Sequence, residues 1–439
     1  ERSRAYIRRA NYSAFEKYLV EVNFSYHGSS TFLPANRFGF FPSVAVGWRF
    51  VDENFVKGFT KNVLTNGKLR VSYGGLGNNS GVGRYEQQQT LDVSNYMIAN
   101  GIIKGLVNKT MINQDLTWEA TKVLNIGLDL GFFDNRLTAE LDYYDRLTSG
   151  MNQSSDLSLI LSGAYNAPRR NIGNLRNRGV EANFNWSDRV GDFHYSFNLN
   201  GSYNRTRLES WSGYLSPGWI YLDLPYHFLY AYDDMGIAQT WQDVYSATPQ
   251  NASPGDILRK DLNGDGKIDG NDKKAYPEIQ RDRPTTNFSF ATSLAWKGFD
   301  LSVLLQGAAG RKDFWLNAYN NVNFSSQRYA SSWSTWENPW SVENRDGEWP
   351  RLGGNANREE TSFWLDNLSY LRLKNLQLGY TVPAFLIKLV GINSIRVYGS
   401  AENIATITSF RGLDPEQTGN KSNAYPLNKS YSVGINVGF

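Results

Sequence analysis

The sequence predicts an all-β protein, a transmembrane antiparallel β-barrel with long extracellular loops, and three observations lead to this fold class. Apolar and polar residues alternate with period two, the connections are short at one end of the strands and long at the other, and the chain ends on an aromatic strand. Following this path gives about 13 strands, whose basis is set out in turn below.

The composition agrees with a strand-rich chain. Trp, Tyr and Phe number 13, 26 and 24 among 439 residues, and charged residues reach only 20%, below the roughly 25% of ordinary soluble domains. The mean hydropathy is -0.49, and no apolar run approaches the roughly 20 residues that a membrane-spanning helix needs. This excludes a helical membrane protein but not a barrel, because only alternate residues of a barrel strand face lipid.

Charge and cysteine usage exclude several classes of function. The formal net charge is +3, from 45 basic and 42 acidic residues spread along the chain. No basic tract is therefore available for phosphates, and nucleic acid is not an expected partner. Cysteine is absent, which excludes disulfides, thiol catalysis and cysteine-based zinc sites. The three histidines belong to no catalytic motif, and we expect no enzyme activity.

Each predicted strand has an apolar, aromatic face and a polar face. The alternation is clearest in residues 18–27, 44–50, 126–132, 193–203, 288–296, 299–305 and 431–439. The apolar face, predicted to meet lipid, includes Val20, Phe24, Phe197 and Leu301. The polar face, predicted to line the lumen as solvated side chains rather than as an acid/base pair, includes His194, Glu21, Asp129, Glu140, Asp142 and Glu181. A soluble sandwich would alternate in the same way.

The lengths of the connections favour a barrel over a sandwich. Short connections at 15–17, 134–136, 187–192 and 297–298 alternate with long ones at about 75–117, 145–178, 205–285 and 307–368. Outer-membrane barrels have short periplasmic turns and long extracellular loops. The long connections are therefore predicted to be extracellular.

The strand count is odd, and the first and last strands both run towards the short turns. Bacterial single-chain barrels have even strand numbers, so we expect an odd number of strands before Glu1. The last strand places an aromatic or apolar side chain at every second position and ends on an aromatic, which resembles the terminal signal for outer-membrane insertion: Tyr431, Val433, Ile435, Val437 and Phe439. An ordinary edge strand is the alternative, although a flat apolar edge would invite aggregation.

Several longer stretches of the sequence occur together and in one order. They are YLVEVNFSYHGSS, FGFFPSVAVGWRF, NIGLDLGFFDNRLTAELDYYDRLTSGM, NIGNLRNRGVEANFNW, DLNGDGKIDGNDK, LAWKGFDLSVLLQG, SYLRLKNLQLGYTVP, RVYGSAENIATIT and YPLNKSYSVGINVGF. As a set they resemble the SusC/RagA group of TonB-dependent transporters over nearly the whole chain. His27 departs from the group, whose members commonly have an acidic residue there, and only local loop contacts are affected.

The resemblance implies a barrel of about 22 strands in the outer membrane of a Gram-negative bacterium, surrounded by outer-membrane lipid. Residues 1–439 would form its C-terminal part, without the N-terminal plug and the first strands. The plug would receive energy from TonB, and a SusD-like surface lipoprotein would cover the barrel as a lid. The implied function is TonB-dependent import of a bulky nutrient, with an oligosaccharide as the leading substrate and a peptide as the other outcome for this group. A passive porin and a structural or adhesive barrel are the alternatives, and an upstream plug would distinguish import from both.

The long connection 205–285 contains an EF-hand-like segment, 261–272. Its ligand positions fall on Asp261, Asn263, Asp265, the Lys267 carbonyl, Asp269 and Asp272, with Gly266 at the sharp turn. Four carboxylates on one short loop repel unless a cation joins them, so we predict structural Ca²⁺ in this extracellular loop. Asp272 stands where EF-hands use a longer Glu, which predicts weak binding, at about 0.1 to 1 mM. The alternative is an acidic, Gly-rich turn held by Asx hydrogen bonds.

Aromatic residues are concentrated in the long connections: Trp211, Tyr214, Trp219 and Tyr221 in one, and Trp315, Tyr319, Trp333, Trp336, Trp340, Trp349 and Trp364 in another. Flat aromatic faces stack on sugar rings or on apolar peptide side chains. They also pack loop against loop or contact protein partners. The substrate-binding residues stay unknown at this level.

Overall fold

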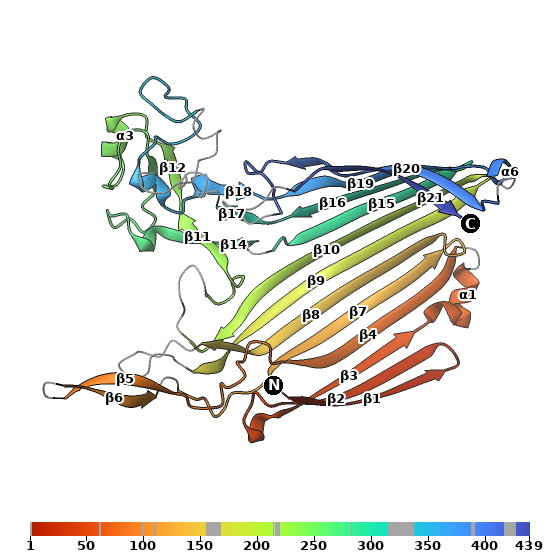
Figure 1. The fold of residues 1–439 in the computed structure, drawn as a ribbon, viewed down its shortest axis with the longest axis horizontal. Coiled ribbons are helices and arrows are strands. Elements are labelled where there is room, and N and C mark those ends of the chain that lie inside the picture. The colour runs from red at the N-terminus through yellow and green to blue at the C-terminus, as the bar shows by residue number, and fades with distance from the viewer. Residues whose placement is uncertain are drawn as a thin grey trace. The chain divides into compact units, whose positions relative to one another are not determined.

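The computed structural model describes residues 2–60, 63–98, 101–108, 111–154, 168–213, 215, 220–281, 283–314, 338–387, 391–416 and 427–439 (Figure 1). Long β-strands dominate these residues, and the helices are short. None of the helices in this part of the chain is long and apolar enough to cross a membrane.

Thirteen strands form one sheet in the order β1-β2-β3-β4-β7-β8-β9-β10-β15-β16-β19-β20-β21. Each strand lies next to the one that precedes it in the sequence, apart from the short strands within the long connections. The predicted number of strands and the predicted up-and-down path are therefore confirmed. The strands are β1 (Ser3–Ala14), β2 (Tyr18–Ser29), β3 (Phe38–Trp48), β4 (Leu64–Asn78), β7 (Glu119–Phe132), β8 (Leu137–Ser154), β9 (Arg169–Val190), β10 (Phe193–Trp211), β15 (Thr286–Trp296), β16 (Phe299–Ala309), β19 (Tyr370–Thr381), β20 (Ser394–Thr408) and β21 (Ser430–Gly438).

The chain divides into two compact units. The first comprises Glu1–Trp186, Ser202–Ser216 and Ile220–Tyr226, and the second comprises Ser187–Gly201, Pro217–Trp219 and His227–Phe439.

In the first unit one face of the sheet is apolar and exposed. Val20 lies opposite Val46 on this face, and the ring of Phe24 stacks on Phe40 with centroids 6.2 Å apart. Other exposed members are Tyr26, Tyr73, Ile126, Tyr143, Val180 and Tyr203. An exposed apolar band edged by aromatic side chains is the outer surface of a membrane barrel.

The second unit repeats this arrangement. Phe197 is exposed, and its ring stacks on Phe290 at 6.2 Å, while Leu301 lies opposite Leu294 on the same face. In β21 the side chains of Tyr431, Val433, Ile435, Val437 and Phe439 are exposed. The predicted outward direction of the apolar residues is therefore confirmed.

Tight turns join the strands at one end, largely as predicted. Phe15 and Glu16 adopt positive φ between β1 and β2, and Lys297 and Gly298 do so between β15 and β16. The predicted connection 187–192 is too long, because β9 continues to Val190. The connections β3 to β4 and β19 to β20 are not tight turns, since they contain helices: η2 (Phe50–Asp52) and α1 (Asn54–Thr60) in the first, α6 (Ala384–Ile387) in the second.

The long connections contain regular structure that the sequence did not predict. Four two-stranded sheets form there: β5 (Leu91–Ile98) with β6 (Gly101–Asn108), β11 (Phe228–Tyr232) with β14 (Lys273–Gln280), β12 (Asp234–Ile237) with β13 (Ile257–Arg259), and β17 (Lys312–Phe314) with β18 (Leu365–Asn367). Short helices accompany them: α3 (Trp241–Ser246), η3 (Gly270–Asp272), η4 (Asn355–Arg358) and η5 (Ser362–Trp364). A further one, η1 (Pro34–Asn36), lies between β2 and β3.

Within the second unit, β11 to β14, β17, β18, α3 and the segment 338–368 form what we call the loop module. Its core consists of buried apolar side chains: Leu229, Ala231, Ile257, Phe314, Trp349 and Trp364. The Trp364 indole is fully buried and donates a hydrogen bond of 3.0 Å to the Asn357 carbonyl. A core of this kind explains why the described parts of these connections pack into one module.

Candidate functional site

The polar face of the sheet in the first unit carries the predicted carboxylates. Asp129 lies directly opposite Glu140, and Asp142 lies directly opposite Glu181. Like charges at opposed positions destabilise a sheet. Cations on the same face offset part of this repulsion. Glu21, the fifth predicted carboxylate, pairs with Arg9 at 2.5 Å.

Arg70 is the cation that joins two of these carboxylates. Its Nη2 lies 2.7 Å from Asp129 Oδ1 and 3.2 Å from Asp142 Oδ2. Arg70 is on β4 and Asp142 on β8, and Gly127 of β7 lies opposite both residues. A Cβ on Gly127 would lie 2.6 Å from Asp142 Oδ1 and 2.7 Å from Arg70 Cζ. Because Gly127 has no side chain, the Arg70 guanidinium can pass over β7 and reach Asp142 on β8.

A second arginine crosses a strand in the same way in the second unit. Arg396 of β20 donates from Nε to Asp300 Oδ1 of β16 at 2.9 Å. Between them lies Gly379 of β19, where a Cβ would be 2.6 Å from both Arg396 Nη2 and Asp300 Oδ1. Arg70 and Arg396 are thus each paired with carboxylates across a strand on the polar face.

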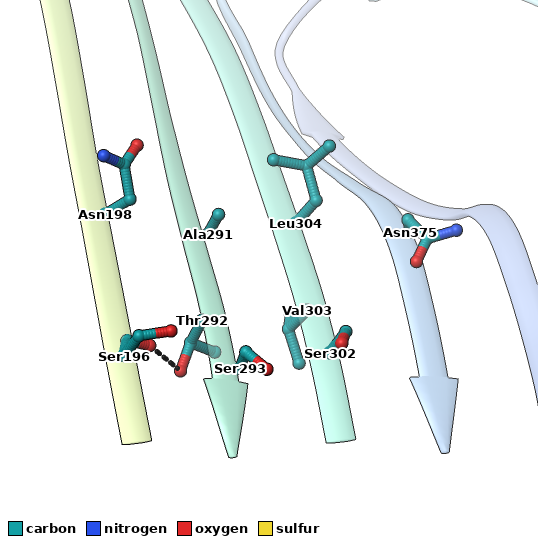
Figure 2. A pocket seen from close by; sticks show the side chains of 9 residues that line it. All are labelled: Ser196, Asn198, Ala291, Thr292, Ser293, Ser302, Val303, Leu304 and Asn375. Atoms are coloured by element: carbon teal, nitrogen blue, oxygen red, sulfur yellow. Dashed lines mark hydrogen bonds between the residues drawn. The ribbon is translucent and has the colours of Figure 1, made fainter. Parts of the chain in front are cut away.

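A neutral hollow of about 330 Å³ lies on the polar face of the second unit (Figure 2). Its polar lining comes from Ser196 and Asn198 of β10, Thr292 and Ser293 of β15, Ser302 of β16 and Asn375 of β19, and its apolar lining from Ala291, Val303 and Leu304. Figure 2 shows the amides of Asn198 and Asn375 on separate strands, with Ala291 and Leu304 on the two strands between them. Ser293 and Ser302 lie opposite each other further along those two strands. None of these groups is charged, and each hydroxyl or amide can both donate and accept hydrogen bonds.

His194, predicted to line the lumen, precedes Ser196 by two residues in β10 and therefore lies on the same face. Its side chain is exposed. The structure gives it no nucleophile or acid partner among the described residues, in line with its interpretation as one more polar lining residue.

The EF-hand-like segment forms a compact loop in which carboxylates accept backbone N–H groups. Asp261 accepts from Gly264 at 2.7 Å and from Gly266 at 2.9 Å, and Asp265 accepts from Lys267 at 2.9 Å. Asn263 accepts from the Asp265 N–H at 2.9 Å. Gly266 has φ of 80° and open space around it, as the sharp turn requires.

Asp269 and Asp272 close this loop. Asp269 accepts from the Asn271 N–H at 2.8 Å. Asp272 is fully buried, and its two carboxylate oxygens accept from Leu262 at 2.9 Å and from Asp269 at 2.8 Å. The backbone N–H of Asp269 holds the pKa of the Asp272 carboxyl below its usual value, although burial acts in the opposite direction.

The loop thus brings its predicted ligands into one turn, where backbone N–H groups already occupy some of the lone pairs of the side-chain oxygens. A carboxylate has about four lone-pair sites, so these hydrogen bonds leave capacity for a cation. In the described part of the chain, no group of three or more acidic or histidine side chains is arranged to hold a metal ion. The calcium site therefore remains a prediction.

The loop aromatics divide into core and surface residues. Trp340, Trp349 and Trp364 are buried in the loop module, where Trp349 and Trp364 stack at 6.1 Å. Tyr221 is exposed and Trp211 is half-buried. Tyr214, Trp219, Trp315, Tyr319, Trp333 and Trp336 lie outside the described residues.

One exposed aromatic pair was not predicted from the sequence. Trp241 and Tyr245 are both exposed on α3, and their rings stack at 5.7 Å with an interplanar angle of 22°. Their spacing of four residues was a usable signal, because side chains at i and i+4 meet on a helix. It was missed because no helix was predicted there.

The comparisons with known proteins agree with this architecture. No family model matches the chain. The chain is 30% identical to the TonB-dependent receptor P3 of Formosa agariphila, over 98% of this chain and 45% of that protein. It is also 30% identical to the TonB-dependent receptor SusC of Bacteroides thetaiotaomicron, over 99% of this chain and 43% of that protein.

Among solved structures, the RagAB peptide transporter matches with a TM-score of 0.82 and 27% identity, over 99% of this chain and 47% of that one. The chain spans somewhat less than half the length of the curated relatives it matches. Its strand order, its exposed apolar face and these matches along its whole length lead to one conclusion. Along its whole length, the chain is similar to members of the SusC/RagA family of TonB-dependent outer-membrane transporters.

Proposed function

We propose that this chain is part of a transporter that imports a bulky nutrient, an oligosaccharide, across the outer membrane at the expense of TonB-coupled energy. The observation that carries the substrate class is the neutral hollow lined by Ser196, Asn198, Ser293, Ser302 and Asn375. Hydroxyl and amide side chains match the mixed donors and acceptors of sugar hydroxyls. A sugar would pass over this surface without having to displace charged groups.

The pairing of the charged groups supports the same proposal. Arg70 and Arg396 are engaged by carboxylates on their own face, so neither guanidinium is free to bind an anionic substrate. A passage for charged substrates would instead need cations or anions free to bind them. The paired charges keep the strands in place while the neutral groups contact the passing molecule.

The partners follow from the family. We propose that TonB acts through a plug outside these 439 residues, that a SusD-like surface lipoprotein covers the extracellular end, and that outer-membrane lipid surrounds the apolar face. The loop module supports a lid, because it is an ordered body with its own buried core and an exposed aromatic pair, Trp241 and Tyr245. Interfaces are enriched in such aromatic residues.

A peptide is the second candidate substrate. The specific observation in its favour is the match to the RagAB peptide transporter, with a TM-score of 0.82. The backbone amides of a peptide would also pair with Asn and Ser side chains. The two candidates therefore differ in the rings and charges of the substrate rather than in the hydrogen-bonding groups of the hollow.

The test of TonB dependence uses cells that carry the full-length transporter, with the TonB system or the neighbouring lipoprotein deleted in turn. Uptake of a labelled oligosaccharide is expected to be abolished without TonB and reduced without the lipoprotein. Undiminished uptake after loss of TonB would favour a passive porin. Undiminished uptake after loss of the lipoprotein alone would remove the lid from the proposal.

The substrate class is tested with the double variant Asn198→Ala/Asn375→Ala in the full-length transporter. We expect slower uptake of oligosaccharide, because two hydrogen-bonding amides are lost from the hollow at about 1 kcal/mol each. The matched control is Asn436→Ala on β21, which does not line the hollow. If an oligopeptide is taken up and an equally large oligosaccharide is not, the peptide alternative holds.

We also propose that the segment 261–272 binds structural Ca²⁺ on the extracellular side, with Asp261, Asn263, Asp265, the Lys267 carbonyl, Asp269 and Asp272 as ligands. The support is the donor set, all of it oxygen, and the turn at Gly266. Bound calcium would draw the exposed carboxylates together and stiffen the loop that joins β13 to β14.

Calcium binding is tested by titration calorimetry on the full-length transporter after chelator treatment. We expect a dissociation constant of about 0.1 to 1 mM, and stabilisation of the loop module by about 1.4 to 2.7 kcal/mol at 10 mM calcium. The variant Asp265→Asn/Asp269→Asn should lose both effects. Asp346→Asn, an exposed carboxylate elsewhere in the loop module, should keep them. Equal titrations for all three proteins would leave the Asx-stabilised turn as the correct description.

A further inference from the structure

A group of basic side chains lies on the outer face of the first unit, at the long-loop end of its strands. Lys122 is on β7, Arg176 and Arg178 are on β9, and Arg205 and Arg207 are on β10. Lys122 and Arg178 are exposed, and the Arg178 side chain keeps 54% of its area. We call this group the outer basic cluster.

The register places the cluster on the apolar face rather than on the polar one. Lys122 lies opposite Leu147, and Leu147 lies opposite Arg176. Arg178 lies opposite Asp145, two residues beyond the pair Tyr143 and Val180. Tyr143 and Val180 are exposed members of the apolar face. Because side chains alternate along a strand, all of these residues share that face. Asn177 of β9 donates to the Thr206 hydroxyl of β10 on the polar face at 2.7 Å, so Arg205 and Arg207, which flank Thr206, lie on the apolar face next to Arg176 and Arg178.

Strand geometry gives the depth of the cluster in the membrane. At the short-turn end, Leu137 lies opposite Trp186, whose ring packs on Phe133. The step from Leu137 to Leu147 is ten residues along β8, or about 33 Å of strand. With a strand tilt of about 40°, this is about 25 Å along the barrel axis, the height of the apolar band. Arg176, opposite Leu147, therefore lies where hydrocarbon ends and headgroups begin.

The charges in the cluster are only partly compensated. Asp145 accepts from Arg176 at 2.7 Å and from Arg178 at 2.9 Å, and Glu209 pairs with Arg176 at 2.8 Å. The five basic side chains of the cluster thus have two carboxylates from the strands, Asp145 and Glu209, as ion-pair partners. Arg207 donates to the Asp223 carbonyl at 2.9 Å. Among the described residues, none is recorded as an acceptor for the guanidinium of Arg205 or the ammonium of Lys122.

Cations at headgroup depth that lack a carboxylate partner attract anionic headgroups. We infer that the outer basic cluster binds the phosphate of a phosphorylated lipid in the outer leaflet, with Arg178 and Arg205 as its principal ligands. Guanidinium groups bind phosphate oxygens in bidentate geometry, and basic groups at this depth recognise anionic headgroups. Asp145 holds Arg178 from the side, which fixes its direction and leaves other N–H donors of the fork available. Tyr143 and Tyr203, both exposed, would contact the acyl chains below the phosphate.

The experiment uses the full-length transporter in nanodiscs of zwitterionic lipid, doped with phosphorylated lipid A or with the same lipid after phosphatase treatment. Mass spectrometry counts the lipid A molecules retained per protein after washing. The wild-type protein should retain the phosphorylated form and release the dephosphorylated one. The variant Arg178→Gln/Arg205→Gln should bind the phosphorylated lipid about tenfold to thirtyfold more weakly. Each basic group near the surface strengthens binding about threefold to sixfold, and the variant lacks two of them.

Two further variants control for charge and folding. Arg189→Gln removes one positive charge at the opposite end of β9 and should leave retention unchanged. Arg178→Lys/Arg205→Lys keeps the charge and should retain most of the binding, which shows that the barrel still folds when these side chains change. Retention that is equal in the wild type and in Arg178→Gln/Arg205→Gln would overturn the inference. Equal retention of phosphorylated and dephosphorylated lipid would overturn it as well.

A last arm separates a lipid headgroup from a free anion. Inorganic phosphate at about 10 mM is added before the wash, to compete with the lipid phosphate for the outer basic cluster. The lipid should stay bound, since its acyl chains hold the phosphate at the cluster. If inorganic phosphate displaces the lipid completely, the cluster is a site for free anions and the lipid assignment is wrong. None of these readouts depends on import, so failure here leaves the proposed function untouched.

Discussion

Gly127 shows how one missing side chain positions a charged group. The guanidinium of Arg70 passes over this residue to reach Asp142, at 3.2 Å. A methyl group at position 127 would occupy the same space, at 2.6 Å from Asp142 Oδ1. The neighbouring strand supplies a natural comparison, because a Cβ on Gly75 of β4 would meet only ordinary contacts at 3.9 Å.

We therefore expect opposite effects from two glycine substitutions. Gly75→Ala should be neutral or stabilising by up to about 0.5 kcal/mol, because glycine weakens a strand interior. Gly127→Ala should destabilise by about 1 kcal/mol, because the bridge to Asp142 is lost and Asp142 stays opposite Glu181. Urea unfolding of the full-length transporter in detergent micelles measures both. Identical shifts for the two variants would mean that the bridge contributes nothing.

Asp272 gives a prediction for pH. Its folded-state pKa is held below its usual value by the Asp269 N–H, so the carboxylate stabilises the loop at pH values above about 4, the ordinary pKa of an aspartate. This contribution is lost as the pH falls below about 4 and through the lower folded-state pKa. Hydrogen exchange at the Leu262 and Asp269 amides, corrected for intrinsic rates, should rise between pH 5 and pH 3. In Asp272→Asn this additional rise should be absent, whereas Asp346→Asn should behave like the wild type.

At the scale of a strand, β10 separates its two faces between neighbouring residues. Phe197 is 38% exposed and stacks on Phe290, while Asn198 lines the neutral hollow. An arginine at the membrane midplane on a lipid face costs about 2 to 4 kcal/mol, and changes on the lumenal face cost far less. Phe197→Arg should therefore reduce folding into lipid bilayers much more than Asn198→Arg. Equal folding yields for the two variants would contradict the assignment of faces.

The loop module is the second element whose stability can be tested separately. Trp364 is fully buried in its core, so Trp364→Ala should destabilise the module by about 3 to 5 kcal/mol. Trp241 is exposed on α3, and Trp241→Ala should change stability by less than about 0.5 kcal/mol. Limited proteolysis of the full-length transporter should cut the loop module in the Trp364→Ala variant but not in Trp241→Ala or the wild type. The barrel of Trp364→Ala should keep the heat-modifiable migration of a folded barrel. Loss of that migration would show that module and barrel fold as one.

The strands were predictable because alternation with period two is visible residue by residue, as in β2 and β10. The small sheets of the loop module were not, since β12 and β13 have four and three residues, too few for a pattern to emerge. Arg70 was missed for a related reason. Its role depends on a glycine one strand away and a carboxylate two strands away, which only the register brings together.

On the scale of the whole molecule, the sheet ends on β1 and β21, and each of these strands has one neighbour in the sheet order. Unpaired backbone groups at such edges cost several kcal/mol each in lipid. We therefore expect residues 1–439 expressed alone to fail to form a heat-modifiable barrel in bilayers, whereas the full-length transporter forms one. A folded, membrane-inserted barrel from this chain alone would show that its own edges can pair.

The arginines that cross Gly127 and Gly379 also help to fix the register between neighbouring strands. A slip of one residue turns every apolar side chain inward, so alternation excludes all odd errors. A slip of two residues keeps every face correct, and alternation cannot detect it. It would, however, move Gly127 away from Arg70 and Gly379 from Asp300, placing a side chain where each guanidinium must pass. Alternation thus excludes register shifts by an odd number of residues, and these two glycines disfavour a register shift of two residues.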